Sequence, residues 1–195
     1  MQINKSLNLV IPIIRSDETK LYIHSTPILQ ETFEQYHLCL SKTFSAFARH
    51  GLDPRSGPSV AAMILKDVAK DTARAPGLSW WEGPDGVGGE GGLMAEIVRL
   101  SNAIVPSKDK GWGTTPLSVA LDQKLIDEEE KSEALNALTF FIVVSAAAPR
   151  VDRPRLVRGM AAIYELQITS LDSTEFAASL RTSTTVESTG EKLPA

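Results

Sequence analysis

The chain has 195 residues, 43% of them hydrophobic, which suffices for one globular domain with a buried core. The formal net charge is −4 and the 20 Lys and Arg residues are scattered, so the sequence lacks a basic surface and we expect no nucleic-acid partner. The single cysteine, Cys39, excludes an intramolecular disulfide and fits a reducing compartment.

The N-terminal segment predicts a β-hairpin over about residues 7–24. Apolar residues alternate with smaller or polar ones in the first half, and Lys20 to His24 forms the return strand after a polar turn. Pro12 has no amide donor, so its strand should lie at a sheet edge or contain a bulge. Asn8 and Pro12 also interrupt the apolar run that follows Lys5, and no small-residue cleavage site follows. We therefore interpret this segment as mature sequence rather than as a signal peptide.

Helical periodicity begins after the hairpin. Aromatic and aliphatic residues recur every three or four positions and predict an amphipathic helix between Gln30 and Gly51. A second helix is expected from Gly57 to about Arg74. The glycine-rich stretch from Trp80 to Gly92 is interpreted as a loop.

The middle of the chain predicts two further helices. Leu93, Ile97, Leu100 and Ile104 have helical spacing, so we expect a third helix that ends before Pro106. Ser107 to Thr115 is interpreted as a loop, and Pro116 to Leu125 as a short helix.

The stretch from Ala134 to Ala148 is apolar around nearly its whole circumference. The acidic residues Asp127 to Glu130 suit the N-terminal end of a helix, and they include a capping-box pair three residues apart. Fifteen residues rise only about 22 Å, short of the roughly 30 Å hydrocarbon core, so we expect no membrane span. We interpret this helix as the centre of the core, with Phe140 and Phe141 on opposite sides so that one of them reaches a binding groove.

The C-terminal part predicts a long helix that contains Leu156, Met160 and Ile163, and a short last helix after Asp172 with Phe176 and Leu180 inward. The fold class expected is therefore mainly α: a bundle of about five to six helices with an N-terminal β-hairpin and a disordered C-terminal tail. We assign residues 1–180 to one domain. Residues 181–195 contain almost no large apolar side chains and are expected to form a flexible polar tail.

The glycine-rich loop has the glycine spacing of a nucleotide-binding motif. The residues from Gly86 to Gly91 fit the spacing G-x-G-x-x-G and stand just before a helix. A dinucleotide site requires a strand directly before the glycines, and here Trp80 to Pro84 precede them. No Lys followed by Ser or Thr comes after the glycines, so a P-loop is excluded as well. We interpret the segment as a flexible connecting loop and expect no cofactor.

No residue pattern points to a metal or to catalysis. His37 and Cys39 are two residues apart on a helix and therefore point in different directions, and His50 lies too far from His37 to share a metal with it. His24 is the remaining histidine. The chain offers no nucleophile elbow and no recognised cysteine-protease signature, so we expect no enzymatic activity.

Two other groups of residues have competing interpretations. Trp80, Trp81 and Trp112 occur in glycine-rich segments, where they can anchor a partner or, as we favour, attach loops to the core. The carboxylates from Glu128 to Glu130 can form a cluster for metal binding or catalysis, but we favour a solvated helix cap.

Three blocks of the sequence resemble tail assembly chaperones of long-tailed, siphovirus-like bacteriophages. The blocks are KSLNLVIPI with YIHSTPI and FEQYHLCLSKTFSAF, then AEIVRLSNAIVP with GWGTTPLSVALDQKLIDEEE and ALNALTFFIVVSA, and finally LQITSLDSTEFAASLRTST. The likeness covers most of Met1 to Thr185. It consists of short matching stretches of sequence and of the order in which they occur along the chain.

The resemblance implies a protein that binds the long, helical, aggregation-prone tape-measure protein during tail assembly in the host cell cytoplasm and is absent from the finished virion. It also implies two further partners: a frameshifted, C-terminally extended form of the chain, and other copies of the chain. We expect the apolar surfaces built by Phe33, Phe44, Phe140 and Phe141 to bind the partner. The alternative hypothesis is a virion structural protein, such as a minor tail or tail completion component.

Overall fold

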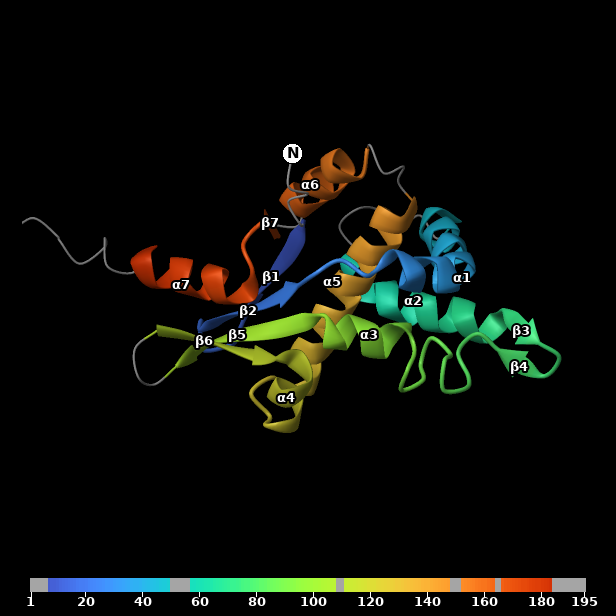
Figure 1. Ribbon diagram of the computed structural model, residues 1–195, viewed down its shortest axis with the longest axis horizontal. Helices are drawn as coiled ribbons and strands as arrows, with labels where there is room; N and C mark the ends of the chain where they lie inside the picture. Colours follow the sequence, from blue (N-terminus) through green and yellow to red (C-terminus); the bar gives the residue numbers. More distant parts are fainter. Residues whose placement is uncertain (1–6, 50–56, 108–110, 148–151, 164–165, 184–195) are drawn as a thin grey trace, which may run out of the picture.

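The computed structural model describes residues 7–49, 57–107, 111–147, 152–163 and 166–183. Within these ranges the centre of the fold is a five-stranded antiparallel sheet with strand order β6-β5-β2-β1-β7 (Figure 1). The prediction of a mainly α-helical bundle is therefore wrong, and the fold is mixed α/β. Only two of these strands were expected: β5 lies in a segment assigned to a helix, β6 lies largely in one assigned to a loop, and the segment of β7 was assigned to no element.

The N-terminal hairpin is confirmed. Strand β1 (Asn8–Ile14) pairs antiparallel with β2 (Lys20–Ser25), and Arg15 N donates to Thr19 O at 2.9 Å in the turn. Strand β7 flanks β1 only over Asn8–Val10. Pro12 pairs with Tyr22 of β2 but lies beyond the part of β1 that pairs with β7, so its missing amide hydrogen removes no bond to β7.

Helix α5 (Glu128–Ala147) packs on one face of the sheet, and α1 (Gln30–Arg49) and α2 (Gly57–Asp71) pack against α5 (Figure 1). Alternate residues of the strands point toward them, among them Leu9, Ile11, Ile13, Leu21, Ile23 and Ala103. Helix α5 contacts α1, α2 and β1, so the prediction of a central core helix is confirmed. No helix in the described part of the chain is long and apolar enough to cross a bilayer.

The middle of the chain differs from the prediction. A short two-stranded ribbon, β3 (Ala73–Ala75) with β4 (Leu78–Ser79), follows α2. Helix α3 (Leu93–Arg99) then ends earlier than expected, and β5 (Ser101–Ser107) pairs with both β2 and β6 (Gly111–Pro116).

The helical spacing failed at this point because residues of β5 alternate between two apolar environments. Ala103 joins the core beneath α5, whereas Ile104 faces α7. Such a short apolar run does not distinguish a buried strand from a helix. The short helix that was expected from Pro116 to Leu125 is present as α4 (Leu117–Asp122).

The C-terminal part contains α6 (Arg153–Ile163), β7 (Gln167–Thr169) and α7 (Ser173–Ser183). Helix α7 packs on the second face of the sheet, where Phe176 and Ala177 contact Val10 and Ile104. The expected capping box is present, because Glu175 N donates to Asp172 Oδ1 at 2.8 Å and Asp172 N to Glu175 Oε2 at 3.0 Å. Helix α7 extends to Ser183, three residues into the segment expected as a tail. The rest of that tail, 184–195, lies outside the described residues.

Candidate functional site: an apolar groove

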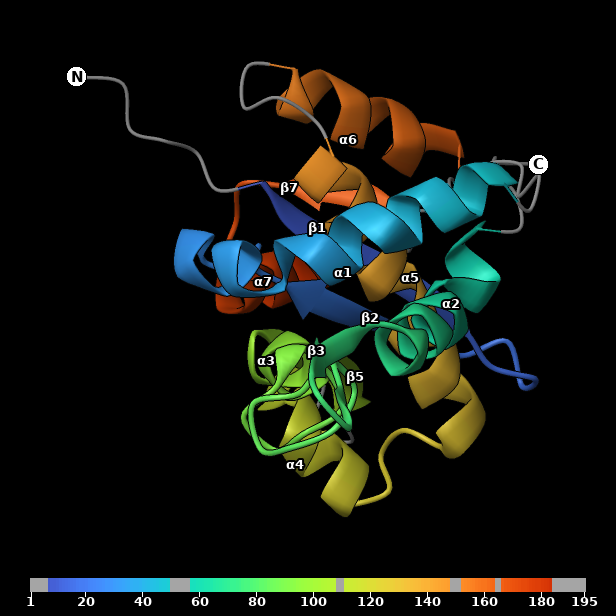
Figure 2. The ribbon, with the colours of Figure 1, turned by 90° about the vertical axis from the view of Figure 1, so that its right-hand side faces the viewer.

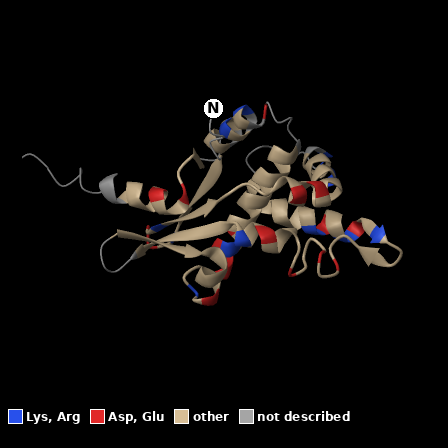
Figure 3. Ribbon diagram, viewed as in Figure 1, with Lys and Arg blue, Asp and Glu red and all other residues tan. Residues whose placement is uncertain are grey.

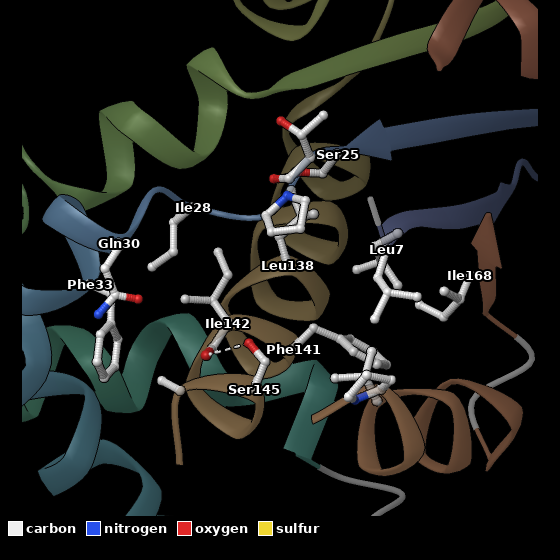
Figure 4. A pocket seen from close by; sticks show the side chains of 16 residues that line it. Leu7, Ser25, Ile28, Gln30, Phe33, Leu138, Phe141, Ile142, Ser145 and Ile168 are labelled. Carbon is white, nitrogen blue, oxygen red and sulfur yellow. Dashed lines mark hydrogen bonds between the residues drawn. The ribbon is translucent and has the colours of Figure 1, made fainter. Parts of the chain in front are cut away.

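An apolar pocket of about 360 Å³ opens to solvent between α1, α5, α6 and the β1–β7 edge of the sheet. We call it the α1–α6 groove, and its lining includes Phe33, Leu138, Phe141, Ile142, Val157 and Ile168. Figure 2 shows α1 crossing in front with α6 above it, and Figure 4 shows the side chains around the space between them. Segments far apart in sequence therefore build one concave surface.

The floor of the groove comes from one stripe of α5. Leu138, Phe141, Ile142 and Ser145 all line it, and their spacing of three, one and three residues places them on one side of the helix. The opposite side of α5 packs against α1 and α2, where the Phe140 and Phe47 rings lie 5.6 Å apart. An all-round apolar helix thus fills the core with one side and leaves the other for the groove.

The polar groups that line the groove are bonded within the protein. Ser145 Oγ donates to Ile142 O at 3.0 Å, Ser25 Oγ to Thr26 O at 3.3 Å, and Gln30 Nε2 to Glu34 Oε1 at 3.0 Å. No Asp, Glu, His, Lys or Arg is among the described lining residues. The arrangement suits the burial of apolar side chains rather than acid–base chemistry or metal binding.

The four predicted partner-binding aromatics divide into two pairs. Phe33 and Phe141 line the α1–α6 groove, so the structure brings them together. Phe140 is buried against α2, where a Cβ placed on Gly57 would collide with its ring. Phe44 is 41% exposed on α1 and does not line the groove. Phe140 and Phe141 were expected on opposite sides of the helix, but their rings lie 5.8 Å apart in edge-to-face contact, so they occupy adjacent sides of α5.

Sequence reasoning did not identify the remaining walls. Leu9 was predicted to lie in the hairpin, but not to line a groove. Val157 lies in a helix that was predicted, although the sequence did not indicate which element this helix packs against. Ile168 lies in β7, which was not expected at all. The alternation of β1 was a usable signal for Leu9, but no local pattern places Val157 or Ile168 beside α5.

The glycine-rich segment forms a folded loop, which corrects its interpretation as a flexible connector. Val87 N donates to Trp80 O at 2.8 Å, and Tyr36 Oη donates to Asp85 O at 2.9 Å. A Cβ on Gly88 would lie 2.4 Å from the Trp81 ring, so this glycine permits the loop to pack on the tryptophan. These glycines serve close packing.

The described histidines and the cysteine lie apart from the groove lining. His24 is buried in β2, with Nε2 3.0 Å from Leu171 O, whereas His37 is exposed on α1. His50 lies outside the described residues. Burial raises the pKa of Cys39 to about 11, which keeps this thiol protonated. Within the described ranges no three His, Cys, Asp or Glu residues form a group that could hold a metal ion.

The tryptophans and the acidic run have partly different roles from those expected. Trp80 and Trp81 pack against the main core, as favoured, but Trp112 lies in strand β6 with its ring 5.3 Å from that of Tyr22.

Glu130 completes the expected capping box with Asp127. Its side chain is also buried and paired with Arg15 of the hairpin at 2.6 Å, so it is more than a solvated cap. The side-chain hydrogen bond to Glu130 is the main cause that raises the pKa of Arg15.

No protein-family model matches the chain, and neither a curated protein sequence nor a solved structure matches it. The features of the molecule that bear on its function are therefore the α1–α6 groove and the three sequence blocks.

Proposed function

We propose that this protein is a tail assembly chaperone that binds the tape-measure protein of a long-tailed bacteriophage in the host cell cytoplasm, without catalysis. The observation that carries the proposal is the α1–α6 groove, an open apolar cavity of about 360 Å³ next to an exposed apolar lip. This lip is Leu29, which is 58% exposed and lies in the chain between Ile28 and Gln30, two residues that line the groove. An apolar surface of this kind suits transient cover of apolar segments in another chain.

The shape of the groove favours a helical client. Its floor is one helix and two of its walls come from the helices α1 and α6, an arrangement that suits the packing of an amphipathic helix in an apolar groove. A client helix that lies along the open side of the groove can insert its apolar side chains between Phe33 and Phe141.

Co-expression with the adjacent tape-measure gene tests this function. Wild-type protein should keep the tape-measure protein in the soluble fraction and co-purify with it. Leu29→Lys places a charge at the mouth of the groove and should lower the yield of complex by about tenfold, because an unpaired charge opposes burial. Met63→Lys is the matched control, since Met63 is 61% exposed on α2 outside the groove. A tape-measure protein that stays insoluble with wild-type protein contradicts the proposal.

Mass spectrometry of purified particles separates this role from that of a virion structural protein. A transient chaperone should be absent from mature virions while remaining abundant in the lysate. Stoichiometric presence in the particles would overturn the chaperone assignment and favour a minor tail or tail completion component.

A further inference from the structure

The two helical walls of the α1–α6 groove carry opposite charges. On α1, Gln30 and Phe33 line the groove, and Glu34 lies one turn after Gln30, on the same side of the helix. Gln30 Nε2 donates to Glu34 Oε1 at 3.0 Å, which holds this carboxylate beside the lining residues. The α1 rim of the groove is therefore acidic.

The α6 rim is basic. Pro154 and Val157 line the groove, and Arg158 lies one turn after Pro154, so it occupies the same side of α6. Arg155 and Arg158 are exposed, and the sequence of α6 contains no Asp or Glu. Figure 3 shows basic residues on α6, all of them arginines, and acidic residues in the N-terminal part of α1.

Both rim charges are available to a partner. Within the described ranges the ion pairs are Arg15 with Glu130, Arg99 with Glu96, and Lys131 with Glu128. Neither Glu34 nor Arg158 takes part in one. Charges at the rim of an interface contribute mainly to association rate, orientation and specificity.

We infer that the segment bound in the α1–α6 groove is an amphipathic helix with oppositely charged flanks, acidic beside Arg158 of α6 and basic beside Glu34 of α1. This inference rests on the proposed chaperone function, and it specifies which of the many apolar segments of a tape-measure protein are recognised. Apolar residues at helical spacing enter the cavity, while the two flanks set the direction of the helix.

Two synthetic helical peptides of identical composition test the inference. Both carry the same apolar stripe; the sorted peptide has Glu along one flank and Lys along the other, and the mixed peptide alternates them on both flanks. Fluorescence anisotropy with the full-length protein should show that the sorted peptide binds about fivefold more tightly, and that added salt reduces this preference.

Charge reversal then tests the direction of the bound helix. Glu34→Lys and Arg158→Glu should each abolish the preference for the sorted peptide. The variant with both changes should restore it with the helix direction reversed, because turning a helix end to end exchanges its flanks. Energy transfer from a fluorophore at one peptide end to a label on the protein reports this reversal. Lys20→Glu, an exposed charge on β2 outside the groove, is the control and should leave the preference intact.

The outcomes separate this inference from the proposed function. Equal binding of both peptides, or of neither, overturns the charged-flank inference, and the proposed function still stands if the tape-measure protein is solubilised and Leu29→Lys prevents it. Discrimination between the peptides without any solubilisation of the tape-measure protein supports the inference about the groove and overturns the proposed client.

Discussion

The rings of Phe140 and Phe141 contact each other edge to face on adjacent sides of α5, with their centroids 5.8 Å apart at an interplanar angle of 81°. Phe140 packs against Phe47 and Gly57, whereas Phe141 borders the α1–α6 groove. Two neighbouring residues of the same type thus connect the core with the candidate binding surface.

The first prediction compares the removal of these two rings. Phe140→Ala should lower the free energy of unfolding by about 3–5 kcal/mol, because it leaves a cavity among packed helices. Phe141→Ala should cost a similar amount, because both side chains are only 4% exposed, and it should in addition weaken binding in the α1–α6 groove, which Phe141 lines. Urea denaturation measures both values. A loss below about 1 kcal/mol for Phe141→Ala would contradict its place in the core.

A second prediction concerns the ion pair between Arg15 and Glu130. Their side chains are 34% and 10% exposed, and Arg15 donates to Glu130 Oε1 at 2.6 Å. Arg15→Ala leaves a buried carboxylate without its cation and should cost about 1–2 kcal/mol, less than a fully buried pair because Arg15 remains partly solvated. A double-mutant cycle with Glu130→Gln measures the coupling. The same cycle for Arg99 and Glu96 should give a smaller value, because the Arg99 side chain is 63% exposed.

The third prediction concerns the attachment of α7 to the sheet. His24 Nε2 and Asn8 Nδ2 both donate to Leu171 O, at 3.0 Å and 2.8 Å, directly before the capping box that begins α7. His24→Ala should accelerate hydrogen exchange in α7 by about three- to tenfold, the effect of one lost hydrogen bond, while α5 keeps its protection. His37→Ala on the exposed face of α1 is the control. Uniform acceleration in α5 and α7 would contradict a local role.

The fourth prediction tests the packed glycine loop. Gly88→Ala should destabilise the protein and change the Trp81 fluorescence, because the added methyl group collides with the indole ring. Gly159→Ala is the matched control, since no atom lies within 4 Å of a Cβ at this helical position. It should stabilise α6 by about 0.5–1 kcal/mol through helix propensity. An unchanged melting temperature for Gly88→Ala would show that the loop moves away freely.

The fifth prediction concerns pH. Burial, with the nearby charges of Glu130 and Glu129, raises the pKa of Glu133 above its ordinary value of 4.5. The folded protein therefore binds this proton more tightly than the unfolded chain, and stability is lost as the pH rises through the folded pKa. Glu133→Gln should raise the melting temperature at pH 7 and have no effect below pH 4.5. An equal shift at both pH values would contradict the raised pKa.

Local rules predicted the elements whose signals are contained in a few consecutive residues. Alternation identified the hairpin around Pro12, and paired acids identified the two capping boxes at Asp127 and Asp172. The apolar circumference of the segment from Ala134 to Ala148 correctly indicated a helix covered on most sides. These features depend on backbone geometry and on short-range hydrogen bonds, which sequence spacing reports directly.

The rest depends on long-range pairing. Ile104 continues the helical spacing of Leu93 and Ile97, but pairing with β2 and β6 makes its segment a strand. Strand β7 has three residues and no periodic signal, and it exists because β1 offers an edge over Asn8–Val10. The groove was consequently anticipated at Phe33 and Phe141, while the walls from α6 and β7 were not.

Pairing between β7 and β1 determines when the α1–α6 groove can exist during synthesis. Asn8 donates to Leu171 O across 163 positions of sequence, so this edge of the sheet closes only after β7 has left the ribosome. A nascent chain that ends after α5 contains Phe33 and Phe141 but lacks Val157 and Ile168. Its apolar floor is then exposed without the walls that give it selectivity, and a finished copy of the protein, rather than a growing one, is the form able to choose its partner.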